Sequence, residues 1–483
     1  MTSSAIDNRS AYGLLTTVLD ENSFNRWDVP VDLTGVPVSY QTTLRRTAVM
    51  TGMDESILTG MGRVHGRPVA IIVSEFQFLG GSIGRAAAER IVSAIRRASA
   101  EGLPVLAATA SGGTRMQEGT PAFVKMVDIT RAVMEHRAMG LPYLVYLRHP
   151  TTGGCFASWG SLGQLTVAEP GALIGFLGPK VFHALTGRSF PPGVQTAENL
   201  HKQGIIDALA GPEELSALVD RTLRVLSDPP SPSILNLRES RHLGDVAAWT
   251  SIQITRNAGR VDVRDVLRVA TSEVVLLSGT GKGERSRSVL TALARIDGEP
   301  CVVVGHDRSR AVPLGPDALR ESRRAMRLAQ EWGLPLVTII DTDGAELSPA
   351  AEEGALSAEI AECIAVLTAL TVPTVSLLLG RGCGGGAIAL LAGSTVIALE
   401  HAWLSPLPPE GASMITYGDP GRAVDIANDQ HVRAADLLAQ GIVHCVIPEL
   451  PEDTVETLAG AAAAQVAHSI RLLRERSAAS PST

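Results

Sequence analysis

The sequence predicts an α/β protein made of two related domains, each built on a largely parallel β-sheet. Two observations carry this prediction. Segments in the two halves of the 483-residue chain match each other at a nearly constant spacing. Apolar runs of strand length also alternate with stretches of helical periodicity, which is typical of βαβ units. A repeat of this length indicates duplicated domains and not a solenoid of short units.

The repeat is clearest where an apolar run ends in glycines. The run that contains Pro142 reaches a glycine pair at 153–154, and the run that contains Pro373 reaches three glycines at 384–386. The two prolines are 231 positions apart (142 to 373). Blocks that begin at positions 66, 102 and 168 recur in the second half at a spacing of 231 or 232. A spacing shared by several blocks indicates a duplicated sequence, whereas unrelated strands would match only singly.

In chain order, the first half is expected to alternate strands with helices, and the second half repeats that order. The expected strands are 69–75, 105–109 and 143–147, and the expected helices are 83–100 and 121–139.

A Pro- and Ser-rich stretch at 227–233 can continue neither a helix nor a strand. We therefore expect a first domain at 1–240 and a second domain at 241–483. The segment 1–45 and the tail after His468 are weakly patterned, and we expect 477–483 to be disordered.

The composition excludes several classes of protein. A net charge of −8, a pI near 5.8 and the absence of basic runs argue against a nucleic-acid or anionic-membrane partner. Five scattered cysteines without a C-x-x-C spacing indicate reduced thiols, not a disulfide framework or a zinc site. The polar N-terminus lacks a secretory signal, so a cytoplasmic location is expected. The apolar stretch 364–404 is interrupted by Pro373, glycines and Arg381, which favours a buried sheet over a membrane span.

The two glycine turns are the features most suggestive of chemistry. A strand that runs into a glycine pair and then a short helix leaves backbone N–H groups unpaired, and such a turn can bind an anion. Two such turns suggest an enzyme that holds two developing negative charges.

Two stretches of the chain are similar to nucleotide-binding motifs. Residues 380–385 satisfy G-x-G-x-x-G after a strand, with Glu400 at the distance of a ribose-binding acid. The stretch between Gly386 and Ser394 is too short for the usual helix, which argues against a dinucleotide site. Residues 279–282 imitate a phosphate loop but lack its first glycine and its Ser or Thr.

Three side chains beside the turns have two interpretations each. Cys155 and Cys383 are nucleophiles or small buried apolar residues. His149 is a general base or a loop residue held by hydrogen bonds. No catalytic side chain stands out, which is what chemistry carried by backbone amides would produce.

Several longer motifs together carry a resemblance to a known family. They are 76–84, 110–119, 150–154, 168–176, 341–345, 380–389 and 405–413. With these motifs the chain resembles the carboxyltransferase subunits of biotin-dependent acyl-CoA carboxylases. Residues 60–215 are similar to the β subunit of the bacterial acetyl-CoA carboxylase carboxyltransferase, and residues 247–450 are similar to its α subunit. As a whole, the chain resembles a fused β–α subunit of the actinobacterial type.

The resemblance implies a fold, an activity and partners. The fold would be two crotonase-like (ClpP/crotonase) ββα-spiral domains, with active sites shared between different subunits of a homo-oligomer. The activity would be transfer of a carboxyl group from carboxybiotin to the α-carbon of acetyl-CoA or another short acyl-CoA. The carboxybiotin would be presented by a separate biotin carboxyl carrier protein, charged by a biotin carboxylase. The biotin anion itself would act as the base.

The resemblance also implies roles for individual residues. Amides at Gly153 and Gly154 would stabilise the thioester enolate, and amides at Gly385, Gly386 and Ala387 would stabilise the biotin ureido oxygen. Two residues would lie near the acyl group, Ile388 and Ala389. Arg115 would be a phosphate ligand of CoA or a structural partner. The other residues implied in CoA binding are Gly80, Gly81, Ser111, Gly112, Gly113 and Gly175.

The sequence departs from the family pattern in several places. Its first cysteine is Cys155, so the zinc ribbon of the β subunit is absent and no zinc is expected. Arg381 stands where an acidic residue is usual, Cys383 where a small residue is usual, and Asp343 where a proline is usual. Two alternatives therefore stay open: a decarboxylase of malonyl thioesters with the same fold, and a non-catalytic assembly subunit of a carboxylase complex.

Overall fold

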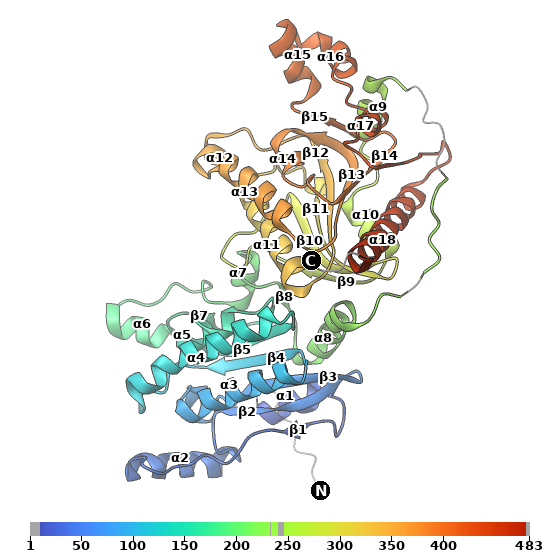
Figure 1. Cartoon of the computed structure of the whole chain (residues 1–483). Coiled ribbons are helices and arrows are strands. Elements are labelled where there is room, and N and C mark those ends of the chain that lie inside the picture. The colour runs from blue at the N-terminus through green and yellow to red at the C-terminus, as the bar shows by residue number, and fades with distance from the viewer. Residues whose placement is uncertain (1–9, 232, 240–245, 480–483) are drawn as a thin grey trace. The chain divides into compact units, whose positions relative to one another are not determined.

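The computed structural model describes residues 10–231, 233–239 and 246–479. These residues form two compact units, coloured blue to green and green to red in Figure 1. The first unit comprises Met1–Leu223 with Gly281–Gly283, and the second comprises Arg224–Thr280 with Glu284–Thr483. Each unit contains an eight-stranded sheet within its described residues.

The sheet of the first unit has the order β1-β2-β3-β4-β5-β6-β8, and β7 pairs with β5. The pairs β1–β2 and β2–β3 are antiparallel, and the others are parallel. The strands are β1 (Asn25–Arg26), β2 (Ile57–Val64), β3 (Arg67–Ser74), β4 (Val105–Ser111), β5 (Tyr143–Thr152), β6 (Leu165–Ala168), β7 (Ile174–Gly175) and β8 (Ala208–Leu209). The helices are α1 (Ala11–Val18), α2 (Val38–Thr51), α3 (Arg85–Ala100), α4 (Gly119–Ala138), α5 (Gly153–Phe156), α6 (Pro179–Thr186), α7 (Ala197–Lys202) and α8 (Pro212–Ser227).

The second unit repeats this plan with the order β16-β14-β13-β12-β11-β10-β9, and β15 pairs with β13. Its strands are β9 (Thr271–Leu277), β10 (Val289–Ile296), β11 (Glu299–His306), β12 (Leu336–Thr342), β13 (Thr374–Cys383), β14 (Thr395–Leu399), β15 (Trp403–Ser405) and β16 (Cys445–Ile447). Its helices are α9 (Ala248–Arg256), α10 (Val263–Ala270), α11 (Pro316–Trp332), α12 (Pro349–Glu353), α13 (Leu356–Ala369), α14 (Gly384–Ile388), α15 (Pro409–Tyr417), α16 (Ala423–Asp429), α17 (Ala434–Ala439) and α18 (Val455–Ala479).

The duplication predicted from the sequence extends to an irregularity in the sheets. In the first unit the pairing of β4 with β5 shifts register between Thr109 and Ser111. In the second unit the pairing of β12 with β13 shifts between Ile340 and Thr342. Both shifts come just before the glycines, so the two turns are set up by the same local device.

The central strands are buried along their whole length and are mostly apolar, because helices cover the sheet. All residues of β4 and β12 are buried, and α3 and α4 pack beside each other in the first unit. Continuous apolar strands are typical of parallel sheets that are covered on both faces. This explains why these strands could be predicted from their sequence.

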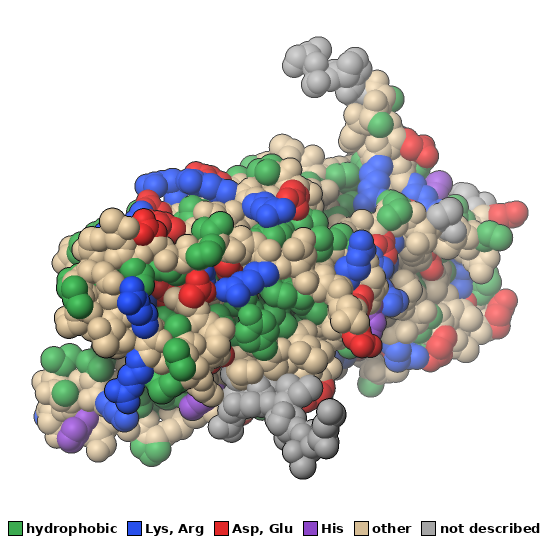
Figure 2. Space-filling model, turned by 90° about the horizontal axis from the view of Figure 1, so that it is seen from below, with side chains coloured by type: hydrophobic (Ala, Val, Ile, Leu, Met, Phe, Trp, Pro, Cys, Tyr) green, Lys and Arg blue, Asp and Glu red, His purple; other side chains and the backbone are tan. Residues whose placement is uncertain are grey.

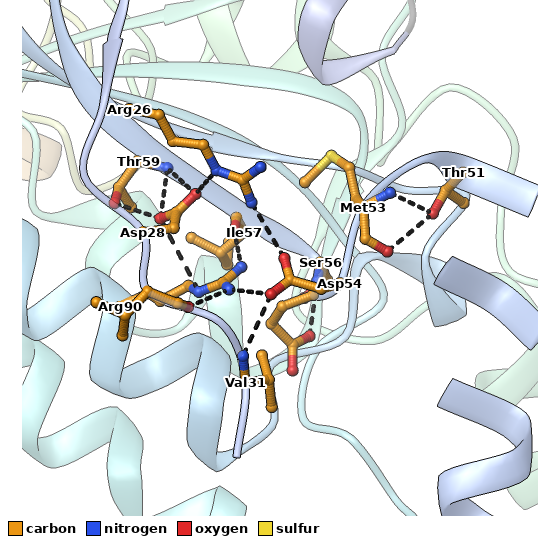
Figure 3. A network of polar contacts seen from close by, with 12 residues as sticks. Arg26, Asp28, Val31, Thr51, Met53, Asp54, Ser56, Ile57, Thr59 and Arg90 are labelled. Carbon is orange, nitrogen blue, oxygen red and sulfur yellow. Dashed lines mark hydrogen bonds and ion pairs between the residues drawn. The ribbon is translucent and has the colours of Figure 1, made fainter. Parts of the chain in front are cut away.

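A polar network fastens the segment before β2 to the rest of the first unit (Figure 3). Arg90 of α3 donates to Asp54 at 2.6 Å and to the Val29 carbonyl at 2.8 Å. Arg26 donates to Asp28 at 2.8 Å and to Asp54 at 3.1 Å. Burial by itself raises the pKa of Asp54, but the hydrogen bond and charge of Arg90 outweigh it, and the net shift of the pKa is downward.

One expectation about the ends of the chain needs correction. The tail after His468 forms the last part of α18, so the predicted disorder is wrong for 477–479, while 480–483 lie outside the described residues. The weakly patterned N-terminal segment contains α1, which buries Leu14 and Val18, and the first part of α2. None of the helices in the described ranges has the length and apolar character needed to cross a membrane.

Candidate active site at two glycine turns

The first turn is built where β5 ends and α5 begins, at Gly153. Its φ of 65° lies in the left-handed region, as does the φ of 109° at Gly113 in the neighbouring loop after β4. A Cβ on Gly153 would lie 3.0 Å from the Cα of Gly113, and a Cβ on Gly113 would lie 3.2 Å from the amide nitrogen of Gly154. The two backbones therefore touch directly, and both glycine positions depend on the missing side chains.

The amides of this turn differ in what they already bind. The N–H of Gly153 donates to the carbonyl of Phe176 at 2.9 Å, and the N–H of Gly113 donates to Ser111 Oγ at 3.0 Å. Within the described part of the chain, the N–H of Gly154 has no acceptor, as expected in the first turn of a helix. Of the two predicted donors, Gly154 is thus the one that can still receive an anion.

The other residues predicted to bind CoA pack tightly against the turn. Gly112 donates its N–H to the carbonyl of Gly80 at 2.8 Å. A Cβ on Gly81 would lie 2.0 Å from the Ala110 carbonyl oxygen, and a Cβ on Gly175 would lie 2.3 Å from Gln195. Close packing therefore accounts for the glycines at 81 and 175 without a ligand.

Arg115 is fully buried, and its guanidinium is surrounded by acceptors of the first unit. Its nitrogens donate to both carboxylate oxygens of Glu55, to Ser56 Oγ at 3.1 Å and to the Ser82 carbonyl at 2.6 Å. Burial by itself would lower the pKa of Arg115, but the hydrogen bonds and charge of Glu55 raise it. Of the two roles considered for this residue, the geometry favours the structural one.

The second turn has the same construction at the end of β13. α14 begins at Gly384 with a φ of 59°, and Gly344 in the loop after β12 has a φ of 122°. The N–H of Gly344 donates to Thr342 Oγ1 at 3.1 Å, as Gly113 does to Ser111. A Cβ on Gly386 would lie 3.4 Å from the carbonyl carbon of Gly344.

The register of the repeat refines which amides correspond. Gly384 and Gly385 occupy the positions of Gly153 and Gly154, since each pair begins its helix. The amides of Gly384, Gly385 and Gly386 belong to the first three helical positions, which an α-helix leaves without an internal acceptor. Ala387 is the first residue whose N–H can reach back to the Cys383 carbonyl. Helix geometry therefore favours Gly385 and Gly386 over Ala387 as donors.

The residues after this turn differ in accessibility. The side chain of Ile388 is 49% exposed, whereas Ala389 is fully buried. Of the two residues predicted to lie near an acyl group, only Ile388 offers its side chain to a ligand.

A charged cluster that the sequence does not reveal lies beside the second turn. Arg381 donates from Nε to Asp341 at 3.1 Å and from its Nη1 to Asp343. Arg308 approaches the other oxygen of Asp341 at 3.3 Å. The sequence gives no signal for this cluster, because its members come from the ends of β11, β12 and β13 or the loops after them, which only the fold brings into contact.

The structure decides between the interpretations of the cysteines and the histidine. Cys155 and Cys383 are buried, and burial raises the pKa of both thiols, to about 12 for Cys383. His149 accepts from the Leu173 amide at 3.1 Å, and its own amide donates to Glu169 at 2.9 Å. These contacts support buried apolar cysteines and a loop histidine.

Sequence comparisons match most of the chain. A family model described as the carboxyl transferase domain matches residues 26–482. A probable biotin-dependent acyl-coenzyme A carboxylase beta3 subunit from Mycobacterium tuberculosis is 52% identical over 94% of this chain and 93% of the relative. The acetyl-coenzyme A carboxylase carboxyl transferase subunits beta/alpha of Salinispora tropica are 35% identical over 86% of this chain and 76% of the relative.

Solved structures resemble the fold at low sequence identity. A transcarboxylase 12S structure, described as a hexamer with methylmalonyl-coenzyme A and methylmalonic acid bound, has a TM-score of 0.78 and 20% identity. The match covers 96% of this chain and 89% of that one. A single-chain, multi-domain long-chain acyl-CoA carboxylase has a TM-score of 0.73, with 95% of this chain and 45% of that chain covered.

Proposed function

The chain belongs to the carboxyl transferase domain family and is a carboxyltransferase of the biotin-dependent acyl-CoA carboxylase class, and on this premise we propose its substrates. They are acetyl-CoA or another short acyl-CoA, and carboxybiotin on a separate carrier protein. The observation that carries the proposal is the pair of glycine turns, each of which presents helix-initial amides at the end of a central strand.

The proposed reaction creates negative charge at two places. Removal of the α-proton of the acyl group leaves an enolate on the thioester oxygen. Breaking the N–CO₂ bond of carboxybiotin leaves charge on the ureido oxygen, and the ureido nitrogen then takes the α-proton while the α-carbon bonds to CO₂. Preorganised N–H donors are effective where charge develops in a transition state. The N–H of Gly154 would receive the enolate, and the amides of Gly385 and Gly386 would receive the ureido oxygen.

The proposal of a short acyl chain rests on the residues after the second turn. Ile388 and Ala389 are small or medium-sized apolar residues, and only Ile388 is accessible. We propose that an acetyl or propionyl group lies beside them.

We also propose that the chain works as a homo-oligomer. Apolar side chains beside the two turns are exposed at equivalent positions of the repeat, Met116 at 82% with Leu347 at 97%, and Phe176 at 69% with Leu407 at 41%. Exposed apolar groups that recur around a candidate site are typical of surfaces covered by a partner. On the face shown in Figure 2, apolar side chains reach the surface between acidic and basic ones.

Reverse transfer tests the proposed function. Purified protein is incubated with malonyl-CoA, methylmalonyl-CoA or a longer 2-carboxyacyl-CoA, with and without biocytin, and release of the decarboxylated thioester is followed. We expect release that requires biocytin and is fastest for a short acyl group. Release without biocytin would support the malonyl-thioester decarboxylase instead, and no release from any thioester would support the assembly subunit.

A further inference from the structure

We propose that Arg381 is a positioning residue of the second glycine turn, acting through Asp341 and Asp343. The inference rests on the proposed function in that this turn holds one of the two developing charges. The contacts that support it belong to the second unit alone.

Asp341 holds Arg381 through two hydrogen bonds. Its side chain is buried at the register shift between β12 and β13, and its Oδ1 accepts from both the backbone N–H of Arg381 at 3.0 Å and Nε at 3.1 Å. A Cβ on Gly380 would lie 2.9 Å from the same oxygen, so glycine is needed there to leave room for the carboxylate. The backbone of Asp341 is itself fixed, because its N–H donates to Nδ1 of buried His306 at 3.2 Å.

Asp343 ties the same guanidinium to the loop that the turn packs against. Nη1 of Arg381 donates to Asp343, one residue before Gly344. Arg381 therefore engages carboxylates on both sides of Thr342, whose Oγ1 accepts the N–H of Gly344. An arginine can do this because its planar guanidinium presents several donors in fixed directions.

The position of Gly344 affects the donors of the turn directly. A Cβ on Gly386 would lie 3.4 Å from the carbonyl carbon of Gly344. A Cβ on Gly344 would lie 3.7 Å from the sulfur of Cys383. A shift of this loop would move the backbone around the amides of Gly385 and Gly386.

The first turn has no equivalent of this clamp. At the spacing of 231, Ala110, Gly112 and Pro150 occupy the positions of Asp341, Asp343 and Arg381 (110 to 341, 112 to 343, 150 to 381). There the loop is held by the hydrogen bond from Gly112 to the Gly80 carbonyl and by the buried ion pair of Arg115 with Glu55, at positions that do not correspond to the clamp. The ionic clamp therefore acts on one of the two candidate anion sites, which makes its effect separable.

The test compares Arg381→Gln, Asp343→Asn and the double variant with the wild type and with Arg422→Gln. Arg422 forms an exposed pair with Asp425 at 2.8 Å in the same unit and serves as the matched control. Reverse transfer yields kcat and KM for the thioester and for biocytin, and hydrogen exchange of peptides covering 384–388 reports on the turn without any substrate.

We expect each single variant to lower kcat by about tenfold, since small displacements of positioned groups slow a reaction strongly. The KM for the thioester should be unchanged, and hydrogen exchange at 384–388 should be faster. The double variant should be no slower than Arg381→Gln, because both changes remove the same contact. Unchanged kcat and exchange in an active protein would overturn the positioning role. An inactive wild type with faster exchange in the variants would instead reject the proposed function and retain the positioning role.

Discussion

At the scale of single residues, the N–H of Gly154 can be deleted by a substitution to proline and compared with a substitution that keeps it. Gly154→Pro removes the donor at the second position of α5, where an α-helix makes no internal bond to the N–H, and Gly154→Ala keeps the donor and adds a Cβ 3.1 Å from Thr114 Oγ1. We expect the proline variant to lose about 10²–10³-fold in kcat relative to the alanine variant, as other enzymes do when one such donor is removed. Equal rates of reverse transfer in the two variants would show that this amide does not bind the enolate.

Cys383 provides a second test at this scale. Because burial raises the pKa of its thiol to about 12, the thiol stays protonated and unreactive near neutral pH. Cys383→Ala should retain kcat to within about twofold, and iodoacetamide should label Cys383 slowly in the folded protein at pH 8. Rapid labelling of this cysteine, or an inactive alanine variant of normal stability, would restore the nucleophile interpretation.

The sequence predicts where the two glycine turns lie, but it does not predict which groups contact them. The glycines that follow each apolar run locate both turns, because a glycine can be read directly from the sequence. The acceptor of the Gly153 amide is not visible, because Phe176 arrives from a separate segment after β7. The contact between Arg381 and Asp343 is likewise created only by the fold, since 37 residues separate the two (343 to 381).

Among the elements, the central strands could be predicted and the terminal helices could not. Strands β3, β4 and β5 each contain an apolar run, at 68–73, 105–108 and 143–147, which burial inside the sheet explains. Helix α18 is rich in alanine, with Ala459 and 461–464 buried, so its apolar residues surround the helix and produce no clear stripe. Its length and position come from tertiary packing, for which the tail sequence gives little sign.

The network of Figure 3 makes a prediction about the segment before β2 and its dependence on pH. Asp54→Asn removes the charge that faces Arg90 and Arg26. Because Asp54 is partly exposed, the loss should be about 1 kcal/mol, or roughly 2–4 °C in melting temperature. The exposed pair between Asp128 and Arg131 provides the control, and Asp128→Asn should change the melting temperature less.

The sign of the pH effect follows from the direction of the pKa shift. The folded pKa of Asp54 is below its ordinary value of 3.8, so its contribution is complete above that value and is lost as pH falls through the folded pKa. The difference in melting temperature between wild type and Asp54→Asn should therefore be constant from pH 7 to pH 5 and narrow below 3.8. A difference that widens on acidification would contradict the assignment of Arg90 as the partner.

For the whole molecule, the exposed apolar side chains beside the turns predict self-association. Met116→Glu and Leu347→Glu should each shift the sedimentation coefficient toward that of a monomer and lower reverse transfer. Val49→Glu, which changes an equally exposed residue on α2 away from the turns, is the control and should do neither. A wild type that sediments as a monomer at every concentration, and is active, would reject the oligomer.

The register shifts at 109–111 and 340–342 also determine how the two sites tolerate change. In the first unit β4 advances two residues across the shift while β5 advances four, from Leu147 to Thr151. In the second unit β12 advances two residues while β13 advances four, from Leu378 to Gly382. The two copies share this surplus of length although His149 and Pro150 have nothing in common with Gly380 and Arg381. The number of residues between the register shift and the turn, more than the identity of their side chains, determines where each glycine turn begins. A scan of two-residue deletions would consequently map these sites more completely than a scan of alanine substitutions.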